Sequence, residues 1–192
     1  MAEIVLFHHA QGLTPGVTAF AERLREAGHT VHVPDLFEGR TFDSIAAGVG
    51  HAREIGMDTV VERGRAAAGE LPAELVYAGF SLGVIPAQAL AQTRPGARGA
   101  LLFEAFLPPS EFGDGWPQGV PVQVHGMQGD EFFAGDGDLA AAEAMAGSTP
   151  DAEVFVYDGE AHLFADDTLP SYDEAAAALL TERVLGFLAR VG

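Results

Sequence analysis

Three residues with the chemistry of acyl transfer, a serine, an aspartate and a histidine, occur in that order along the chain. Ser81 stands in the segment Gly79-Phe80-Ser81-Leu82-Gly83, a G-x-S-x-G pattern between a short apolar run and a helix-like segment. A serine at such a strand-to-helix turn is exposed at the positive end of the helix, because the flanking glycines let the backbones approach closely. The pattern predicts a nucleophile, although a serine that only caps a helix would show the same letters.

A serine nucleophile needs a base, and the base needs an acid that orients it. Asp130 lies in a glycine-rich loop after the apolar run 120–125, and His162 lies in the loop after the run 153–157. The order serine, acid, histidine, with the last two after later strands, is the order of α/β-hydrolases. We therefore predict a catalytic triad of Ser81, Asp130 and His162.

Other residues could fill the same roles. Glu104 follows the apolar run 99–103 and is the alternative acid, or a group that supports the triad from behind. His125, His8 and His9 are alternative bases. The adjacent pair His8-His9, without cysteine or a suitably spaced carboxylate, is a weak metal signal, so we expect no metal site.

The transition state of acyl transfer also needs donors for a developing oxyanion. The first donor expected is the amide of Leu82, directly after the nucleophile. The second is expected in the loop after the first strand, His8-His9-Ala10-Gln11-Gly12, where we favour the amide of Ala10. A loop that only connects strand to helix is the alternative.

Aromatic residues near these loops predict a cleft that favours a neutral, apolar acyl or alcohol group. Aromatic side chains are as often part of a core as of a pocket, and the sequence does not separate the two. The residues expected to contact substrate are His9, Phe37, Phe80, Trp116 and Phe164, with Phe106 and Phe132 as further parts of the roof.

Composition excludes several other chemistries. The 192 residues include 28 acidic and 10 basic ones, all arginine, which gives a net charge of −18. The absence of lysine and cysteine excludes a Schiff-base lysine, a phosphate-loop lysine, thiol catalysis and disulfides. The negative charge disfavours nucleic acids and anionic membranes as partners. We expect no cofactor.

The residues singled out above require a sheet whose strands end at one edge. Short, continuously apolar runs alternate with amphipathic stretches, which is typical of an α/β fold with a mostly parallel, twisted sheet of about six or seven strands and helices on both faces. In such a sheet, the loops after the strands build the site. The expected strands are 3–7, 30–33, 75–79, 99–103, 120–125 and 153–157.

The remaining segments complete a single domain over residues 1–192. Apolar residues at helical spacing predict helices that end near Gly28 and near the C-terminus, whereas 34–54 and 104–119 are expected to be loops or short caps. Pro86 predicts a distorted first turn after the elbow. No apolar run approaches a membrane span, and we expect a cytoplasmic protein, with a monomer plausible.

The chain resembles the dienelactone hydrolase family of α/β-hydrolases over essentially its whole length. The resemblance is carried by the polar loop HHAQG, by Pro34-Asp35-Leu36-Phe37, by G-F-S-L-G, by the Gly-Asp loop with Asp130 and by G-E-A-H-L-F around His162. It implies a cleft over Ser81 that hydrolyses small esters or lactones without a cofactor.

The sequence departs from the family pattern in ways that bear on substrate. The nucleophile of the family is commonly cysteine, and a glutamate of the first loop activates it; Ser81 and His9 stand at those places here. An arginine that binds the substrate carboxylate is replaced by Asp166, so we expect a neutral ester or lactone. Alternatives are a thioesterase or acyltransferase with the same triad, and a non-catalytic ligand-binding protein.

Overall fold

A single parallel β-sheet organises the computed structural model, which describes residues 1–192. The strands are β1 (Glu3–Phe7), β2 (Thr30–His32), β3 (Val76–Phe80), β4 (Gly99–Phe103), β5 (Val122–Met127) and β6 (Ala152–Tyr157). Their order across the sheet is β2-β1-β3-β4-β5-β6, and every neighbouring pair is parallel. This architecture confirms the predicted α/β fold.

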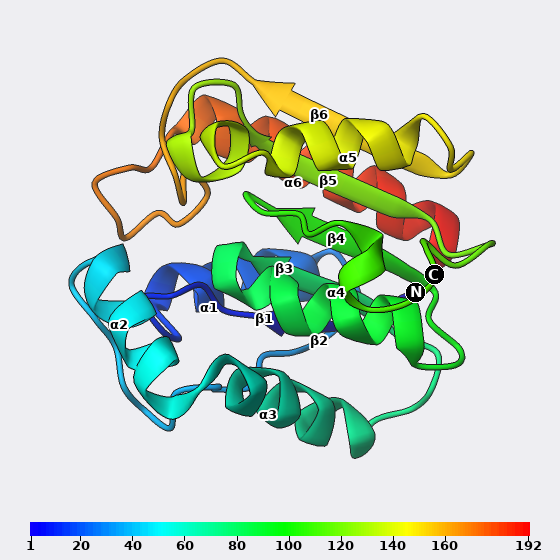
Figure 1. The fold of residues 1–192 in the computed structure, drawn as a ribbon, viewed down its shortest axis with the longest axis horizontal. Coiled ribbons are helices and arrows are strands. Elements are labelled where there is room, and N and C mark those ends of the chain that lie inside the picture. The colour runs from blue at the N-terminus through cyan, green and yellow to red at the C-terminus, as the bar shows by residue number, and fades with distance from the viewer.

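Helices cover both faces of the sheet (Figure 1). They are α1 (Pro15–Glu26), α2 (Ile45–Ile55), α3 (Met57–Gly69), α4 (Val84–Thr93), α5 (Asp138–Ala146) and α6 (Glu174–Val191). Apolar residues of α1 and α6 form one buried cluster with one face of the strands, and residues of α2 to α5 form a second cluster on the other face.

Alternation along the strands explains these two clusters. In β1, Val5 and Phe7 belong to one cluster and Ile4 and Leu6 to the other, and all four side chains are fully buried. Successive side chains of a strand point to opposite faces, so a strand covered on both sides must be apolar at every position. The continuous apolar runs of the sequence therefore mark the central strands.

One segment differs from its prediction. Residues 34–54 were expected to form loops, but α2 begins within them at Ile45, with Ser44 as its N-cap. The expectation was wrong because Gly48 and Gly50 weaken the helical pattern. A Cβ atom at Gly48 would lie 1.7 Å from the carbonyl oxygen of Ala10, so this glycine is needed for close packing within a helix.

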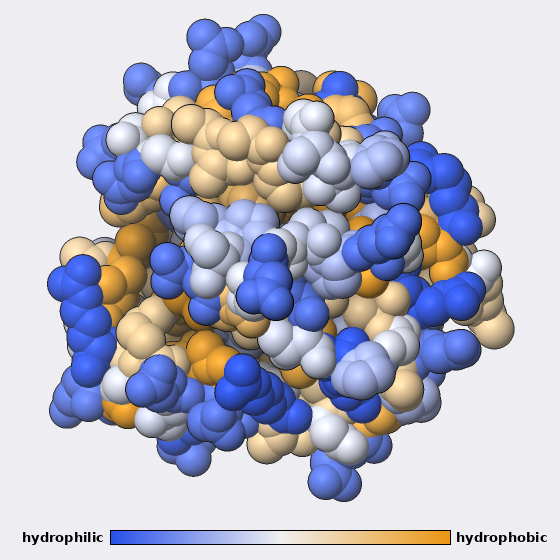
Figure 2. All heavy atoms as spheres, turned by 45° about the vertical axis from the view of Figure 1, so that its right-hand side comes forward, coloured by the Kyte–Doolittle hydropathy of each residue, from blue (hydrophilic) through white to orange (hydrophobic).

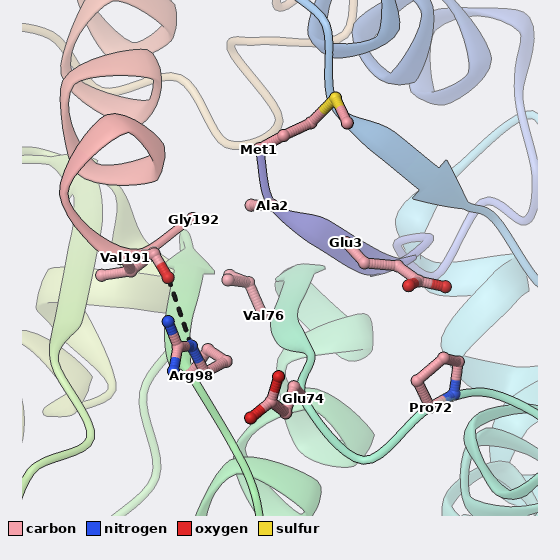
Figure 3. Close-up of a pocket in the computed structure, with 9 residues that line it drawn as sticks. All are labelled: Met1, Ala2, Glu3, Pro72, Glu74, Val76, Arg98, Val191 and Gly192. Atoms are coloured by element: carbon pink, nitrogen blue, oxygen red, sulfur yellow. Dashed lines mark hydrogen bonds between the residues drawn. The ribbon is translucent and has the colours of Figure 1, made fainter.

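The carboxyl ends of the strands and the chain termini lie at opposite edges of the sheet. The N- and C-terminal ends lie side by side (Figure 1), where the Arg98 side chain donates to the carbonyl of Val191 beside a cavity of about 300 Å³ (Figure 3). No helix is both long and apolar enough to cross a membrane. On the face shown in Figure 2, hydrophilic side chains surround small groups of apolar ones.

Candidate active site

Ser81 occupies a strained turn between β3 and α4. Its φ angle is +48°, in the left-handed region that residues other than glycine rarely adopt. Steric contacts explain why glycine stands on each side of this turn. A Cβ atom at Gly79 would lie 2.2 Å from the carbonyl oxygen of Gly83, and a Cβ atom at Gly83 would lie 2.4 Å from the carbonyl oxygen of Phe7. A 3₁₀ turn, Ser81–Gly83, precedes α4, in agreement with the distorted turn expected from Pro86.

A continuous chain of hydrogen bonds joins the three residues of the predicted triad. The Oγ of Ser81 lies 2.8 Å from Nε2 of His162, and Nδ1 of the same ring lies 2.6 Å from Oδ2 of Asp130. Because a carboxylate can only accept, Nδ1 of His162 carries the proton and Nε2 is left to accept from the serine hydroxyl. This is the tautomer that a general base for Ser81 requires.

Asp130 is held in place from its other side. It is fully buried after β5, and its Oδ1 accepts from the amides of Phe132 and Phe133, at 2.9 and 3.4 Å, in the π-helical turn Glu131–Gly135. Burial alone would lower the pKa of His162, but the hydrogen bond to Asp130 and the nearby charge of Glu104 outweigh it and raise that pKa. These interactions therefore stabilise the protonated ring of His162, the imidazolium ion that forms when the ring takes a proton.

Glu104, the alternative acid, makes no hydrogen bond to the His162 ring, which bonds to Asp130 instead. Its Oε1 accepts from the amide of Phe164 at 2.8 Å, and its Oε2 is buried without a partner. Burial raises the pKa of Glu104 to about 7, against the opposing effects of His162 and the Phe164 amide. Glu104 therefore supports the loop that carries His162, and it adds a negative charge near the ring only when its carboxyl group is ionised.

The alternative bases lie elsewhere. His125 is buried on β5 with Nδ1 2.8 Å from the hydroxyl of Tyr157, and burial lowers its pKa to about 3. His8 is buried against the amide of Leu36, at 3.0 Å, and burial lowers its pKa to about 4. No group of three or more His, Asp or Glu side chains is arranged to hold a metal ion.

The predicted oxyanion donors lie in the loops that follow the neighbouring strands β3 and β1. The amide of Leu82 directly follows the nucleophile in the 3₁₀ turn. The amide of Ala10, in the loop after β1, is buried and donates no hydrogen bond within the chain. A buried amide without a partner is unfavourable by itself, so it is available to bind an anionic oxygen.

Four of the five side chains expected to contact substrate are buried. Phe37, Phe80 and Phe164 are 1%, 3% and 0% exposed and belong to the core clusters, so they present almost no surface to a cleft. They fill space between the sheet and its helices instead. His9, 1% exposed, points to Asp166 on the loop after His162 rather than to open space.

Trp116 lies at the other edge of the sheet. Its indole N–H donates to the carbonyl of Val120, just before β5 begins, whereas Asp130 follows the end of that strand. It lines a cavity of about 440 Å³ with residues 148–151, which precede β6. Its predicted role beside Ser81 is therefore wrong, because segment 104–119 runs back along the molecule.

Phe132 is the aromatic residue that the structure places at the site. Its ring centroid lies 4.8 Å from that of His162, and the side chain is 43% exposed. Because Phe132 is exposed and does not pack into the core, its side chain is available for contact with a bound molecule beside the candidate base. The sequence included Phe132 in the expected roof, but only the structure separates it from the buried phenylalanines.

A parallel sheet with a serine elbow and hydrogen-bonded Asp and His after later strands defines the α/β-hydrolase class. The chain belongs to the dienelactone hydrolase family, whose model matches residues 1–192. None of the curated protein sequences matches this chain.

Solved structures have the same fold. The dienelactone hydrolase-like promiscuous phosphotriesterase P91 from metagenomic libraries is 19% identical, with a TM-score of 0.79 over 100% of this chain and 87% of its own. A putative dienelactone hydrolase from Klebsiella pneumoniae is also 19% identical, with a TM-score of 0.76 over 99% and 87%. Thermogutta terrifontis esterase 2, solved phosphoramylated by tabun, is 20% identical, with a TM-score of 0.63 over 100% and 83%.

Proposed function

We propose that this hydrolase cleaves small, neutral carboxylic esters or lactones through an acyl-enzyme on Ser81. The observation that carries the proposal is the unbroken series of hydrogen bonds from Asp130 through His162 to Ser81, at 2.6 and 2.8 Å. A buried carboxylate, a histidine in the right tautomer and an accessible hydroxyl on a strained turn are the parts that an activated serine needs.

In the proposed mechanism, His162 takes the proton of Ser81 as the serine oxygen attacks the ester carbonyl. Asp130 stabilises the imidazolium ion, which then gives the proton to the leaving alcohol. Water, activated by the same histidine, hydrolyses the acyl-enzyme. General-base catalysis contributes about 10²–10⁴-fold in rate.

The amides of Leu82 and Ala10 are proposed to bind the oxyanion in both steps. Each donor would contribute about 3 kcal/mol of transition-state stabilisation. The same amides serve acylation and deacylation, because each step forms its own tetrahedral intermediate with the negative charge on the same carbonyl oxygen.

The charge of the site supports a neutral substrate. Asp130 and Asp166 are buried around the loop of His162, Glu104 adds a further negative charge when it ionises, and the chain has a net charge of −18. An anionic acid portion would be repelled at this edge of the sheet. Phe132, exposed beside His162, offers an apolar contact to the acyl or alcohol portion.

Labelling by a fluorophosphonate, followed by intact mass, tests the nucleophile. One adduct is expected on the wild type and on Ser148→Ala, a control serine exposed beyond α5, and none on Ser81→Ala or His162→Ala. The esterase relative that tabun phosphoramylates supports this choice of probe. Labelling is followed by turnover of neutral p-nitrophenyl esters and lactones. A folded wild type that neither labels nor turns over would contradict the proposal and favour a ligand-binding role.

A further inference from the structure

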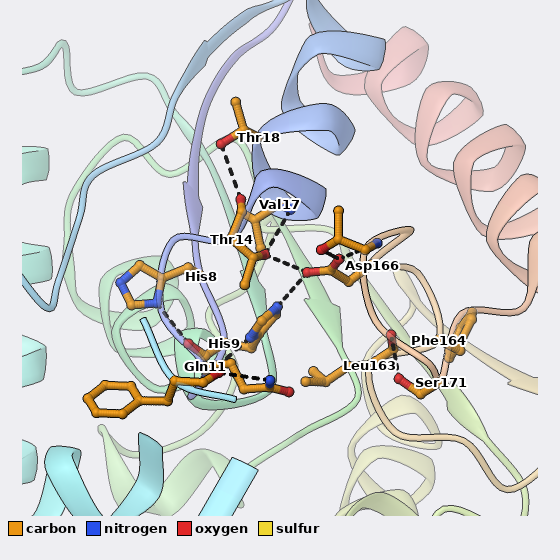
Figure 4. Close-up of polar contacts among 12 residues, drawn as sticks. His8, His9, Gln11, Thr14, Val17, Thr18, Leu163, Phe164, Asp166 and Ser171 are labelled. Atoms are coloured by element: carbon orange, nitrogen blue, oxygen red, sulfur yellow. Dashed lines mark hydrogen bonds and ion pairs between the residues drawn. The ribbon is translucent and has the colours of Figure 1, made fainter. Parts of the chain in front are cut away.

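A buried carboxylate connects the loop after β1 to the loop that carries His162 (Figure 4). Asp166 is 4% exposed and lies four residues after His162. Its Oδ2 accepts from Nε2 of His9 at 2.9 Å and from the hydroxyl of Thr14 at 2.5 Å, and its Oδ1 accepts from the amide and hydroxyl of Thr168, at 2.9 and 2.6 Å. Burial alone would raise the pKa of Asp166, but these hydrogen bonds outweigh it and lower the pKa to about 2.

The hydrogen bonds of His9 fix its tautomer and its orientation. Its Nδ1 accepts from the amide of Gln11 at 3.2 Å, so its proton is on Nε2 and is donated to Asp166. The ring is 1% exposed and lies edge-on to Phe80, at a centroid distance of 6.5 Å. His9 is therefore held at both ring nitrogens and cannot act as a proton acceptor for Ser81.

The same residue determines where the Ala10 amide points. The carbonyl of His9 belongs to the same peptide group as the Ala10 N–H, and it accepts from the amide of Gly12 at 3.0 Å and from Nδ1 of His8 at 2.8 Å. Because the two groups of a trans peptide point in opposite directions, fixing the carbonyl fixes the N–H. The Ala10 N–H is thus left free and directed away from the turn.

The Asp166 carboxylate packs so closely against the start of α1 that the chain must have glycine there. A Cβ atom at Gly16, at the start of α1, would lie 1.7 Å from Oδ1 of Asp166, so only glycine leaves room for the carboxylate. The carboxylate therefore joins three segments: the loop with Ala10, the start of α1 and the loop with His162.

We propose that His9 and Asp166 are positioning residues that hold the Ala10 amide in a fixed position relative to His162. The inference rests on the proposed function. One hydrogen bond ties the loop of the oxyanion donor to the loop of the general base, so the two groups keep a common geometry. A displacement of the donor by about 1 Å can cost about 10²-fold in rate, which gives such a link its catalytic value.

Two substitutions of His9 separate the link from the local turn. In His9→Asn, the short amide keeps an acceptor near the place of Nδ1 but does not reach Asp166. In His9→Gln, the amide nitrogen reaches roughly the place of Nε2. We expect the asparagine variant to lose about 30- to 100-fold in kcat with little change in KM, and the glutamine variant to recover at least about tenfold of that loss.

Both oxygens of Asp166 accept hydrogen bonds, so the N–H₂ group of Asp166→Asn must face donors, either those of His9 and Thr14 or those of Thr168. This variant is expected to lower kcat by as much as His9→Asn does. Asp167→Asn, which changes the same charge at the neighbouring exposed residue, is its matched control, and His32→Gln, which breaks a surface pair with Glu3, is the control for His9.

Rates are expressed per active site, counted by fluorophosphonate labelling, and the Tm of each variant is measured in parallel. Unfolded molecules then do not enter the comparison. If His9→Asn and Asp166→Asn lower Tm but keep kcat per labelled site within about twofold of the wild type, the link only stabilises the fold and the proposal is overturned. Equal loss in His9→Asn and His9→Gln also overturns it. A wild type without labelling or turnover instead contradicts the proposed function.

Discussion

Glu104 predicts an unusual dependence of stability on pH. Its carboxyl group is 1% exposed, one oxygen accepts from Phe164, and the other has no partner. Glu104→Gln keeps the shape of the side chain and an oxygen for the Phe164 amide, but it cannot ionise. Comparison of the two proteins therefore isolates the cost of a buried negative charge.

The magnitude follows from the pKa. Burial raises the pKa of Glu104 from its ordinary 4.5 to about 7, and each pKa unit corresponds to about 1.4 kcal/mol, so ionisation in the fold costs about 3 kcal/mol. Below pH 4.5 the carboxyl is protonated in both states and there is no penalty. As pH rises from 4.5 to 7, the unfolded chain loses its proton while the folded chain keeps it, so the wild type loses stability.

Urea denaturation at pH 5 and pH 8 measures the effect. The free energy of unfolding of Glu104→Gln minus that of the wild type is expected to increase by about 2 to 3 kcal/mol between these two pH values. The same substitution at the exposed Glu111 is the matched control. A difference that stays constant with pH would refute the reasoning, because it would mean that Glu104 ionises as readily in the fold as in the unfolded chain.

Three further predictions concern catalysis and the elbow. Because His162 must be neutral to accept a proton and its pKa is raised, kcat/KM for a neutral ester should fall as pH decreases through that raised pKa; a rate independent of pH from 5 to 9 would contradict this. Asp130→Asn should lower kcat by about 10⁴-fold in single-turnover assays, because it removes the acceptor for Nδ1 of the histidine; a loss below about tenfold would argue against its role. Gly83→Ala should lower the free energy of unfolding by more than about 2 kcal/mol, because its Cβ atom would lie 2.4 Å from a carbonyl oxygen of β1. Gly186→Ala, on α6 with nothing within 4 Å, should raise it by about 0.5 to 1 kcal/mol in the same urea assay.

The strands and the order of the site residues could be predicted because both depend on short-range patterns. β4 was predicted at its observed bounds, and β3 and β6 within one residue, since continuous apolar runs mark strands buried on both faces. In a parallel sheet the ends of these strands meet at one edge. Placing Ser81, Asp130 and His162 directly after them was therefore enough to expect that they lie near each other.

What the sequence could not supply depends on packing between distant segments. The glycines of α2 argue against a helix until Gly48 is seen against the carbonyl of Ala10. Phe37 and Phe132 are equally apolar, and only the arrangement of the loops makes one core and leaves the other exposed. The pairing of His9 with Asp166, 157 residues apart, has no local signal at all.

Residues 1 and 192 lie close together in space. A Cβ atom on Gly192 would lie 2.7 Å from the main-chain nitrogen of Ala2, at the edge of the sheet remote from Ser81 (Figure 3). A short flexible linker could therefore join residues 1 and 192, and new ends could be opened in the exposed segment 113–115. Such a circular permutant would keep every loop that carries the candidate site, and would show that the order of the strands in space, rather than along the gene, assembles it.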